Sequence, residues 1–278
     1  MRAISRCGVV WRQCLVLIMA VVGLSQVVRS EGPVVVAHRG LLRDAPENTL
    51  AGFRAALDLR VGFEVDVRRC LSGELVCVHD NTVNRTTNGT GRVSDLSWAE
   101  LSTLDAGGWF DPAYEGTPIP KLSEVFGLLR EKPEADVLIA IDLKGEDEEI
   151  EHDVVALAEE FGVLERLLFI GRAIQHPEVR VRLHEANRKA QVAAVANDRR
   201  ELANVLEDAS ADWAYLRFIP TPEEIEMIRA TGRDVFLAGP TVATRQEKNW
   251  ILALRAGVDA ILTDDALELR RLVRLATR

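Results

Sequence analysis

"VVVAHRGLLRDAPENTLAGF", residues 34–53, holds the first strand–turn–helix unit of the chain. Its first four residues are all apolar, which is typical of a strand that is buried on both faces, as in a parallel sheet. His38 and Arg39 follow at once, and charged side chains are costly to bury. We therefore expect both to face a polar opening at the carboxyl end of this strand, where α/β folds place their binding sites.

The same alternation of apolar runs and helical patterns continues along the chain. Nine predicted strands cover residues 33–38, 62–67, 75–80, 137–143, 167–171, 191–196, 213–218, 234–239 and 259–263. This order predicts parallel βαβ units and a TIM (β/α)8 barrel, which needs only eight strands. Strands 62–67 and 75–80 have no helix between them. We therefore expect that one of the nine strands is wrongly predicted. This unit would be either a hairpin or a βαβ unit that has lost its helix.

Residues 81–118 interrupt the alternation with turn-forming residues and scattered aromatic side chains. We expect them to form a small insertion after the third strand, within one barrel domain that spans residues 31–278. Trp109, Phe110 and Tyr114 lie in this insertion. They would form either an apolar lip that touches the substrate or a small satellite core.

Residues 1–30 differ from the rest of the chain. They combine early arginines, an apolar run of about a dozen residues and small residues before Glu31, which is typical of a secretory signal peptide. The apolar run is shorter than the ~20 residues that a spanning helix needs, so an uncleaved anchor is the weaker alternative. The sequence therefore predicts export to the periplasm or outside the cell, with no stable membrane span after cleavage.

The charge of the chain limits the classes of ligand. The formal net charge is −9, and residues 1–30 carry four arginines and no acid, so the remainder carries −9 − 4 = −13. Such an acidic protein is a poor nucleic-acid binder, and we expect no nucleic-acid partner. An anionic substrate must be attracted by a local positive site.

Cys70 and Cys77 are the cysteines of the predicted mature chain. Export would permit a disulfide between them. A two-residue hairpin would pair Cys77 with Arg68 instead, so we expect two buried thiols.

Glu64 and Asp66 are the first candidate metal ligands. They lie two residues apart on a predicted strand, so their carboxylates project to the same face. Adjacent carboxylates repel each other, and a divalent cation relieves that repulsion. Hard oxygen ligands favour Ca²⁺ or Mg²⁺ over zinc. Taken alone, the pair is more typical of an ordinary solvated strand face.

Other polar residues at strand ends strengthen the prediction of a site. His38, His79 and Asp142 each follow or end an apolar run, and Lys144 lies two residues beyond Asp142. The carboxyl ends of parallel barrel strands meet at one rim, so these side chains would face one pocket with Glu64 and Asp66. Two imidazoles beside a metal suggest a general acid and a general base. Cations there would neutralise a phosphoryl oxygen, so this combination predicts metal-assisted phosphodiester cleavage.

The motifs "AHRG", "PENT", "FEVDV", "VHD", "RTTNGTGRV", "IPKLSEVF", "IDLKG" and "GVDAILTDD" occur in this order. In this set the chain resembles the glycerophosphodiester phosphodiesterase family, a TIM-barrel family, over residues 34 to 265. The resemblance implies that His38 and His79 are the acid–base pair. It also implies that Arg39 contacts the phosphate and that Lys144 has a phosphate-directed role.

The resemblance further implies metal binding by Glu64, Asp66 and Asp142. Two departures stand out. Asp142 is one methylene shorter than the glutamate usual in the family, and residues 236–243 lack the aromatic of the family's C-terminal strand. The second departure leaves the substrate less certain than the reaction type.

The predicted function is metal-dependent hydrolysis of glycerophosphodiesters to glycerol 3-phosphate and an alcohol. One alternative is a phospholipase D-like phosphodiesterase that acts on lipids or polymers. Another is a binding protein that kept the barrel and lost catalysis. The sequence leaves the metal, the head group and the oligomeric state open.

Smaller features have structural explanations as well. Glu47 and Asn48 could reach the metal or the substrate, but Asn48, beside Thr49, fits a helix cap better. The remaining histidines lie on polar faces of predicted helices, and we expect them to be solvated. They are His152, His176 and His184.

Overall fold

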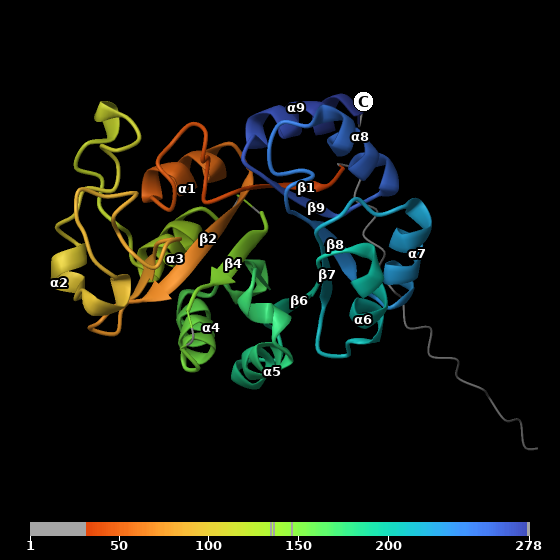
Figure 1. Ribbon diagram of the computed structural model, residues 1–278, viewed down its shortest axis with the longest axis horizontal. Coiled ribbons are helices and arrows are strands. Elements are labelled where there is room, and N and C mark those ends of the chain that lie inside the picture. The colour runs from red at the N-terminus through yellow and green to blue at the C-terminus, as the bar shows by residue number, and fades with distance from the viewer. Residues whose placement is uncertain (1–31, 134, 136, 146, 277–278) are drawn as a thin grey trace, which may run out of the picture.

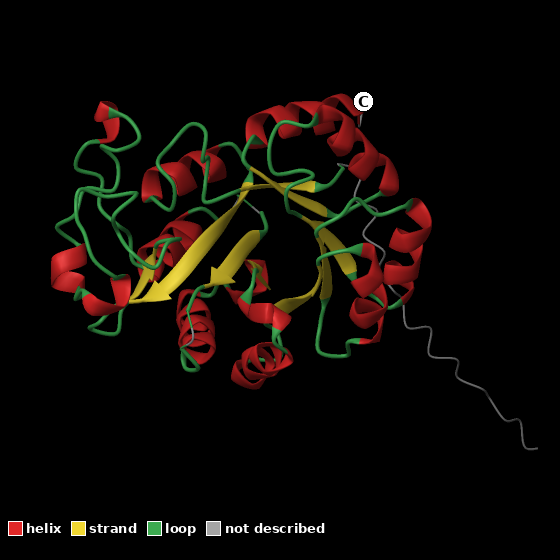
Figure 2. Cartoon of the chain, viewed as in Figure 1, coloured by secondary structure: helices red, strands yellow, loops and turns green. Residues whose placement is uncertain are grey.

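The computed structural model describes residues 32–276 except 134, 136 and 146. Eight parallel strands form a closed barrel (Figure 2). They are β1 (Val34–Ala37), β2 (Gly62–Arg69), β4 (Ile139–Leu143), β5 (Leu167–Ile170), β6 (Gln191–Ala196), β7 (Trp213–Leu216), β8 (Asp234–Leu237) and β9 (Ala260–Thr263). The barrel closes because β1 pairs in parallel with both β9 and β2. The predicted TIM barrel is confirmed.

All nine predicted strands form. The expectation that one of them is wrongly predicted is therefore incorrect. The ninth, β3 (Leu75–Cys77), pairs antiparallel with β2 as a hairpin arm outside the barrel. The connection has five residues, 70–74, so Val67 and not Arg68 lies opposite Cys77. Both cysteines are free and buried, as expected.

Helices surround the barrel in the order that the alternation predicts (Figure 1). They are α1 (Leu50–Asp58), α3 (Leu122–Glu131), α4 (Ile150–Phe161), α5 (Pro177–Ala186), α6 (Leu202–Glu207), α7 (Pro222–Ala230), α8 (Glu247–Ala256) and α9 (Ala266–Ala276). Thr221 caps α7 in a capping box, and Gly257 ends α8 in a left-handed conformation. Local sequence therefore sets these helix ends.

The chain between β3 and α3 forms the predicted insertion, which lies beside α1 in the yellow part of Figure 1. It contains the short helix α2 (Trp98–Leu101). With the hairpin it buries an apolar cluster of its own, separate from the barrel core. This cluster comprises Cys70, Val76, Val78, Val83, Val93, Leu101, Ala106 and Ile119. This satellite cluster packs the insertion against the end of β2.

The aromatic side chains of the insertion do not form the satellite core, and their contact with a substrate stays a prediction. Phe110 packs edge to face against both Trp109 and Tyr114, with ring centroids 5.8 Å apart in each pair. None of the three belongs to the satellite cluster. The Tyr114 hydroxyl donates a hydrogen bond to the Asp44 carbonyl at 3.0 Å. These rings therefore link the insertion to the loop after β1.

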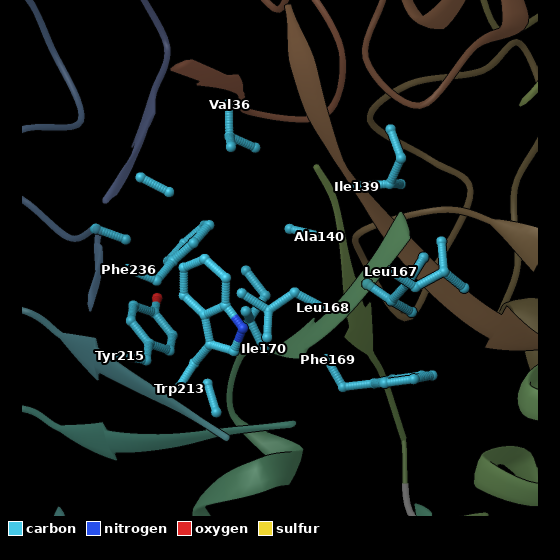
Figure 3. Close-up of a cluster of buried hydrophobic side chains, with 14 of the residues drawn as sticks. Val36, Ile139, Ala140, Leu167, Leu168, Phe169, Ile170, Trp213, Tyr215 and Phe236 are labelled. Carbon is cyan, nitrogen blue, oxygen red and sulfur yellow. The ribbon is translucent and has the colours of Figure 1, made fainter. Parts of the chain in front are cut away.

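The barrel interior is filled by side chains from all parts of the sheet. Figure 3 shows Trp213, Tyr215 and Phe236 meeting inside it. On β2, Phe63 stacks on Phe53 of α1 with centroids 4.4 Å apart. This contact turns Phe63 toward the helices, so its neighbour Glu64 faces the barrel interior.

The predicted signal segment, residues 1–30, lies outside the described residues and stays a prediction. Among the described helices, none is long and apolar enough to cross a membrane.

Candidate active site

A cavity of about 470 Å³ opens at the carboxyl ends of the barrel strands. Four residues predicted for the site at strand ends line it: His38, His79, Asp142 and Lys144. Glu64 lines it too. The closed barrel thus brings residues from β1, β2, β4 and the β3 hairpin to one place, as the convergence of strand ends requires.

The three predicted metal ligands form one cluster at the bottom of this cavity. Ligand atoms of Glu64, Asp66 and Asp142 all lie within 4.8 Å of one another. Glu64 and Asp66 are only 2% and 0% exposed. Within the described part of the chain, Oδ1 of Asp142 is buried and accepts no hydrogen bond. Buried carboxylate oxygens without donors fit a hard divalent cation.

Burial and crowding shift the carboxyl groups in different directions. Burial raises the pKa of Glu64 well above its usual value, and Asp66 and Asp142 add to the effect. Burial would raise the pKa of Asp66 as well, but Lys144 and Arg39 outweigh it and lower that pKa. The cluster therefore favours ionised Asp66 and opposes ionisation of Glu64, and a bound cation would favour the ionised form of both carboxylates.

Lys144 pairs with two of these carboxylates. Its Nζ lies 2.6 Å from Asp142 Oδ2 and 3.0 Å from Asp66 Oδ1. Burial would lower the pKa of Lys144, but Asp66 and Asp142 raise it well above its usual value. The ammonium group therefore stays charged at the edge of the cluster.

Each cavity histidine is held by an aspartate. Nδ1 of His38 lies 2.7 Å from Asp264 Oδ1, and Nδ1 of His79 lies 2.8 Å from Asp80 Oδ1. Each carboxylate accepts a hydrogen bond from a protonated Nδ1, so Nε2 of each ring is available to the cavity. Nε2 of His38 lies 4.0 Å from Glu64 Oε2. Both imidazoles are thus oriented for proton transfer beside the carboxylate cluster.

Arg39 lies beneath the cluster and is absent from the residues that line the cavity. Its Nη1 donates to Glu47 Oε1 at 3.0 Å, and its Nε lies 3.4 Å from Asp66 Oδ2. Arg85 binds Glu47 from the other side and also binds Asp80. A chain of alternating charges therefore joins the carboxylate cluster to His79.

Asn48 has a different role from the helix cap that we expected. Thr49 is the N-cap of α1, and its side chain accepts from Gly52 N. The Asn48 amide instead donates to Asp66 Oδ2 at 2.8 Å and accepts from Asp66 N at 3.1 Å. Arg39 and Asn48 both have left-handed backbones, with φ of 52° and 55°. This costly conformation is typical of functional sites.

Gly171, just after β5, makes room for the shortened carboxylate. Its φ is +95°, and a Cβ added there would overlap with the carboxyl group of Asp142. The Asp142 side chain therefore packs where any other residue at 171 would place its own.

Several site residues were not predicted. Asp264 and Asp80 follow predicted strands, and the "VHD" and "TDD" motifs were the signal that could have found them. Arg85 lies in the insertion, where local sequence gives no indication of its partners. His152 and His176 are exposed, as expected.

His184 differs from the other two histidines. Its side chain is only 14% exposed, and its Nε2 lies 3.0 Å from Asp212 Oδ2. The expectation that it is solvated is wrong because α5 packs it against the loop before β7.

Known proteins are similar to this chain in sequence and in fold. The model of the glycerophosphoryl diester phosphodiesterase family matches residues 38–268. A glycerophosphodiester phosphodiesterase of Caldanaerobacter subterraneus subsp. tengcongensis is 34% identical over 248 residues, which cover 87% of this chain and 98% of that protein. The chain belongs to the glycerophosphoryl diester phosphodiesterase family.

Solved structures of glycerophosphodiester phosphodiesterases and related phosphodiesterases have the same fold. One from Agrobacterium tumefaciens is 28% identical with a TM-score of 0.73, and the match covers 86% of this chain and 99% of that one. A phosphodiesterase of Oleispira antarctica, solved with the product sn-glycerol-3-phosphate, has a TM-score of 0.70 at 24% identity, over 87% of this chain and 97% of that one. Family membership confirms the predicted enzyme class, a phosphoric diester hydrolase with a small-molecule phosphodiester substrate.

Proposed function

We propose that this glycerophosphodiester phosphodiesterase holds a divalent cation with Glu64, Asp66 and Asp142, and uses His38 and His79 as its general acid–base pair. The products are glycerol 3-phosphate and an alcohol. The observation that carries the proposal is the buried, donor-free oxygen of Asp142 in a cavity that two histidines, each oriented by an aspartate, also line.

Charge supports the need for a cation. Glu64, Asp66 and Asp142 contribute −3, and Lys144 and Arg39 contribute +2, so the cluster carries −3 + 2 = −1 when all are ionised. A phosphodiester is also negative, and like charges in a buried site repel strongly. A bound divalent cation, Ca²⁺ or Mg²⁺, would change the sign and supply Lewis-acid stabilisation of the phosphoryl oxygens.

The two histidines divide the proton transfers. One imidazole accepts a proton from the attacking oxygen, and the other donates a proton to the leaving alcohol oxygen. Asp264 and Asp80 keep each Nδ1 protonated, so that each Nε2 handles the mobile proton. Lys144 donates toward the phosphate from the edge of the cluster. Arg39 keeps Asp66 charged from below, and we propose that it acts on the phosphate through this carboxylate.

The first experiment measures glycerol 3-phosphate released from glycerophosphocholine and glycerophosphoethanolamine, with and without EDTA. We expect turnover that chelation abolishes and that Ca²⁺ or Mg²⁺ restores. Full turnover in EDTA would contradict the metal proposal, and no turnover of any glycerophosphodiester would contradict the substrate.

The second experiment compares His38→Ala and His79→Ala with His152→Ala, an exposed histidine on α4 that is 74% exposed. We expect kcat to fall by about 10²- to 10⁴-fold in the two cavity variants, the usual contribution of a general acid or base. Metal binding by calorimetry should persist in all three. Equal activity of the cavity variants and the control would refute the assignment.

The altered C-terminal strand keeps the lipid and polymer alternative open. Gly239, Pro240 and Ala243 line the cavity there, and no aromatic residue of the segment 236–243 does. A preference for intact lipid vesicles over soluble diesters would favour the phospholipase D-like alternative. Metal binding without turnover of any diester would favour a binding protein.

A further inference from the structure

The part of the cavity lining that follows β5, β7 and β8 is called the far wall here; β7 lies opposite β2 in the barrel, whereas β5 adjoins β4. In the barrel order, β7 is four strands from β2 in either direction. Arg217, one residue beyond β7, therefore lies across the mouth from Glu64 and Asp66. Arg172, two residues beyond β5, lines the same cavity but lies nearer to the carboxylates, because β5 pairs with β4 and Gly171 lies against Asp142. Neither arginine is needed to explain how the scissile phosphate is held.

Arg217 is a half-buried cation without an anionic partner. Among the described residues, neither Arg217 nor Arg172 makes an ion pair or a side-chain hydrogen bond. A partly buried guanidinium without a carboxylate partner is costly to desolvate, so an anionic ligand would stabilise it. Arg39 and Arg85, by contrast, each have a carboxylate partner.

Gly239 leaves room for the Arg217 side chain. The glycine has φ of +94°, and a Cβ added there would lie 3.3 Å from Arg217 Cβ and 3.4 Å from its Nε. The guanidinium stem therefore lies across the end of β8, where any other residue at 239 would crowd it. This position is in the segment that lacks the family's aromatic.

The far wall carries charge of one sign only. Its lining residues include Arg172, Arg217 and the largely buried Tyr215, but no carboxylate. The acids that line the cavity, Glu64, Asp142 and Asp264, follow or belong to β1, β2, β4 and β9 or lie beside them. The cavity is thus divided into a metal-binding wall and a cationic wall.

We propose that Arg217 and Arg172 form a subsite for a second negative charge, so that the preferred substrates are glycerophosphodiesters whose alcohol carries a phosphate or a carboxylate. This inference rests on the proposed function, which places the scissile phosphate at the opposite wall. A cationic head group such as choline would meet two like charges at this subsite.

The test compares kcat/KM for four diesters that share the glycerol phosphate moiety. Glycerophosphoglycerol is neutral beyond the scissile phosphate, and glycerophosphocholine is cationic. The third diester is glycerophosphoglycerol with a terminal phosphate, and the fourth is the corresponding diester of glyceric acid, with a terminal carboxylate. We expect one or both anionic diesters to exceed glycerophosphoglycerol by roughly 10- to 100-fold, the value of a charge-assisted contact. The stronger of the two identifies the anion.

Variants locate the effect. In Arg217→Ala we expect the ratio of kcat/KM for the better anionic diester to that for glycerophosphoglycerol to fall roughly tenfold or more. Arg217→Lys should retain part of the ratio, and Arg172→Ala should lower it less, because Arg172 is exposed. Arg200→Ala is the matched control. Arg200 lies on the same rim, 90% exposed and paired with Asp198, outside the cavity.

The outcomes separate the two proposals. Absence of turnover of every diester would overturn the proposed function. Turnover of glycerophosphoglycerol without any preference for the anionic diesters would overturn the subsite alone. So would a preference that Arg200→Ala lowers as much as Arg217→Ala does, because the effect would then come from the overall field and not from a contact.

Discussion

The two walls of the active-site cavity differ in how their charges are paired. On the wall formed by β1, β2 and β4, the charged groups form a connected network in which Arg39 joins Asp66 to Glu47. On the far wall, Arg172 and Arg217 make no ion pair within the described structure. The difference shows which charges hold the site together and which are available to a ligand.

Replacing Asp66 with asparagine should have the largest effect. Asp66 is fully buried, and Lys144, Arg39 and Asn48 all contact it. We expect kcat/KM to fall by about 10³-fold or more, because charge stabilisation by a metal is worth several kcal/mol. Calorimetry should show loss of Ca²⁺ or Mg²⁺ binding.

Asp198→Asn is the control for Asp66→Asn. Asp198 is an acid on the same rim whose partner is Arg200, and it is absent from the cavity lining. We expect this variant to keep metal binding. Metal-dependent turnover that survived in Asp66→Asn would contradict the ligand assignment.

Glu47→Gln should lower the free energy of unfolding more than Arg217→Ala does. Glu47 is buried between two arginines, and removal of one partner from a buried network costs about 3 kcal/mol. Arg85 is 43% exposed, so we expect a loss of about 2 kcal/mol in the free energy of unfolding. Arg217→Ala, without an ion pair to lose, should cost less than about 1 kcal/mol. Equal losses in urea unfolding would contradict the contrast.

The Glu47 effect should depend on pH with a defined sign. Burial would raise the pKa of Glu47, but hydrogen bonds and charges from Arg85 and Arg39 lower it below its ordinary value of 4.5. A lowered pKa contributes stability above pH 4.5 that is lost as the pH falls through the folded-state pKa. The difference between wild type and Glu47→Gln should therefore shrink below pH 4.5.

Gly171→Ala should weaken the metal site without removing a ligand. The new Cβ would displace the Asp142 carboxylate, and loss of ligand positioning typically costs 10- to 100-fold in metal affinity. Gly232→Ala is the matched control, because Gly232 also has a positive φ, +83°, but has open space around its Cβ position. Equal metal affinity in both variants would show that Asp142 does not depend on this glycine.

Tyr215 should give the smallest and most local signal. Burial raises its pKa to about 12 from 10.0, with Arg217 opposing the shift. A raised pKa means that its stabilising contribution is present below pH 10 and is lost as the pH rises through 12. The chain has two tyrosines, so ultraviolet titration should show a step near pH 12 that Tyr215→Phe removes. Persistence of that step in the variant would contradict the assignment.

Local patterns predicted much of the site. Glu64 and Asp66 were placed on one face by the two-residue period of a strand, and His38 by its position at a strand end. The role of Asn48 was not predictable, because a capping pattern in the sequence is the same whether Asn48 or Thr49 makes the cap. Its bonds to Asp66 form only when β2 lies beside the turn before α1.

The sequence by itself determined the alternation of strands and helices, the eightfold barrel and the carboxylates and histidines at its strand ends, because these depend on short-range periodicity. Only the tertiary structure decided which charges pair. Asp264 reaches His38 across 226 residues because barrel closure places β9 beside β1. The same closure places Arg217 opposite the carboxylate cluster, where no described acid pairs with it. Pairing depends on distances between strand ends, which no local pattern contains.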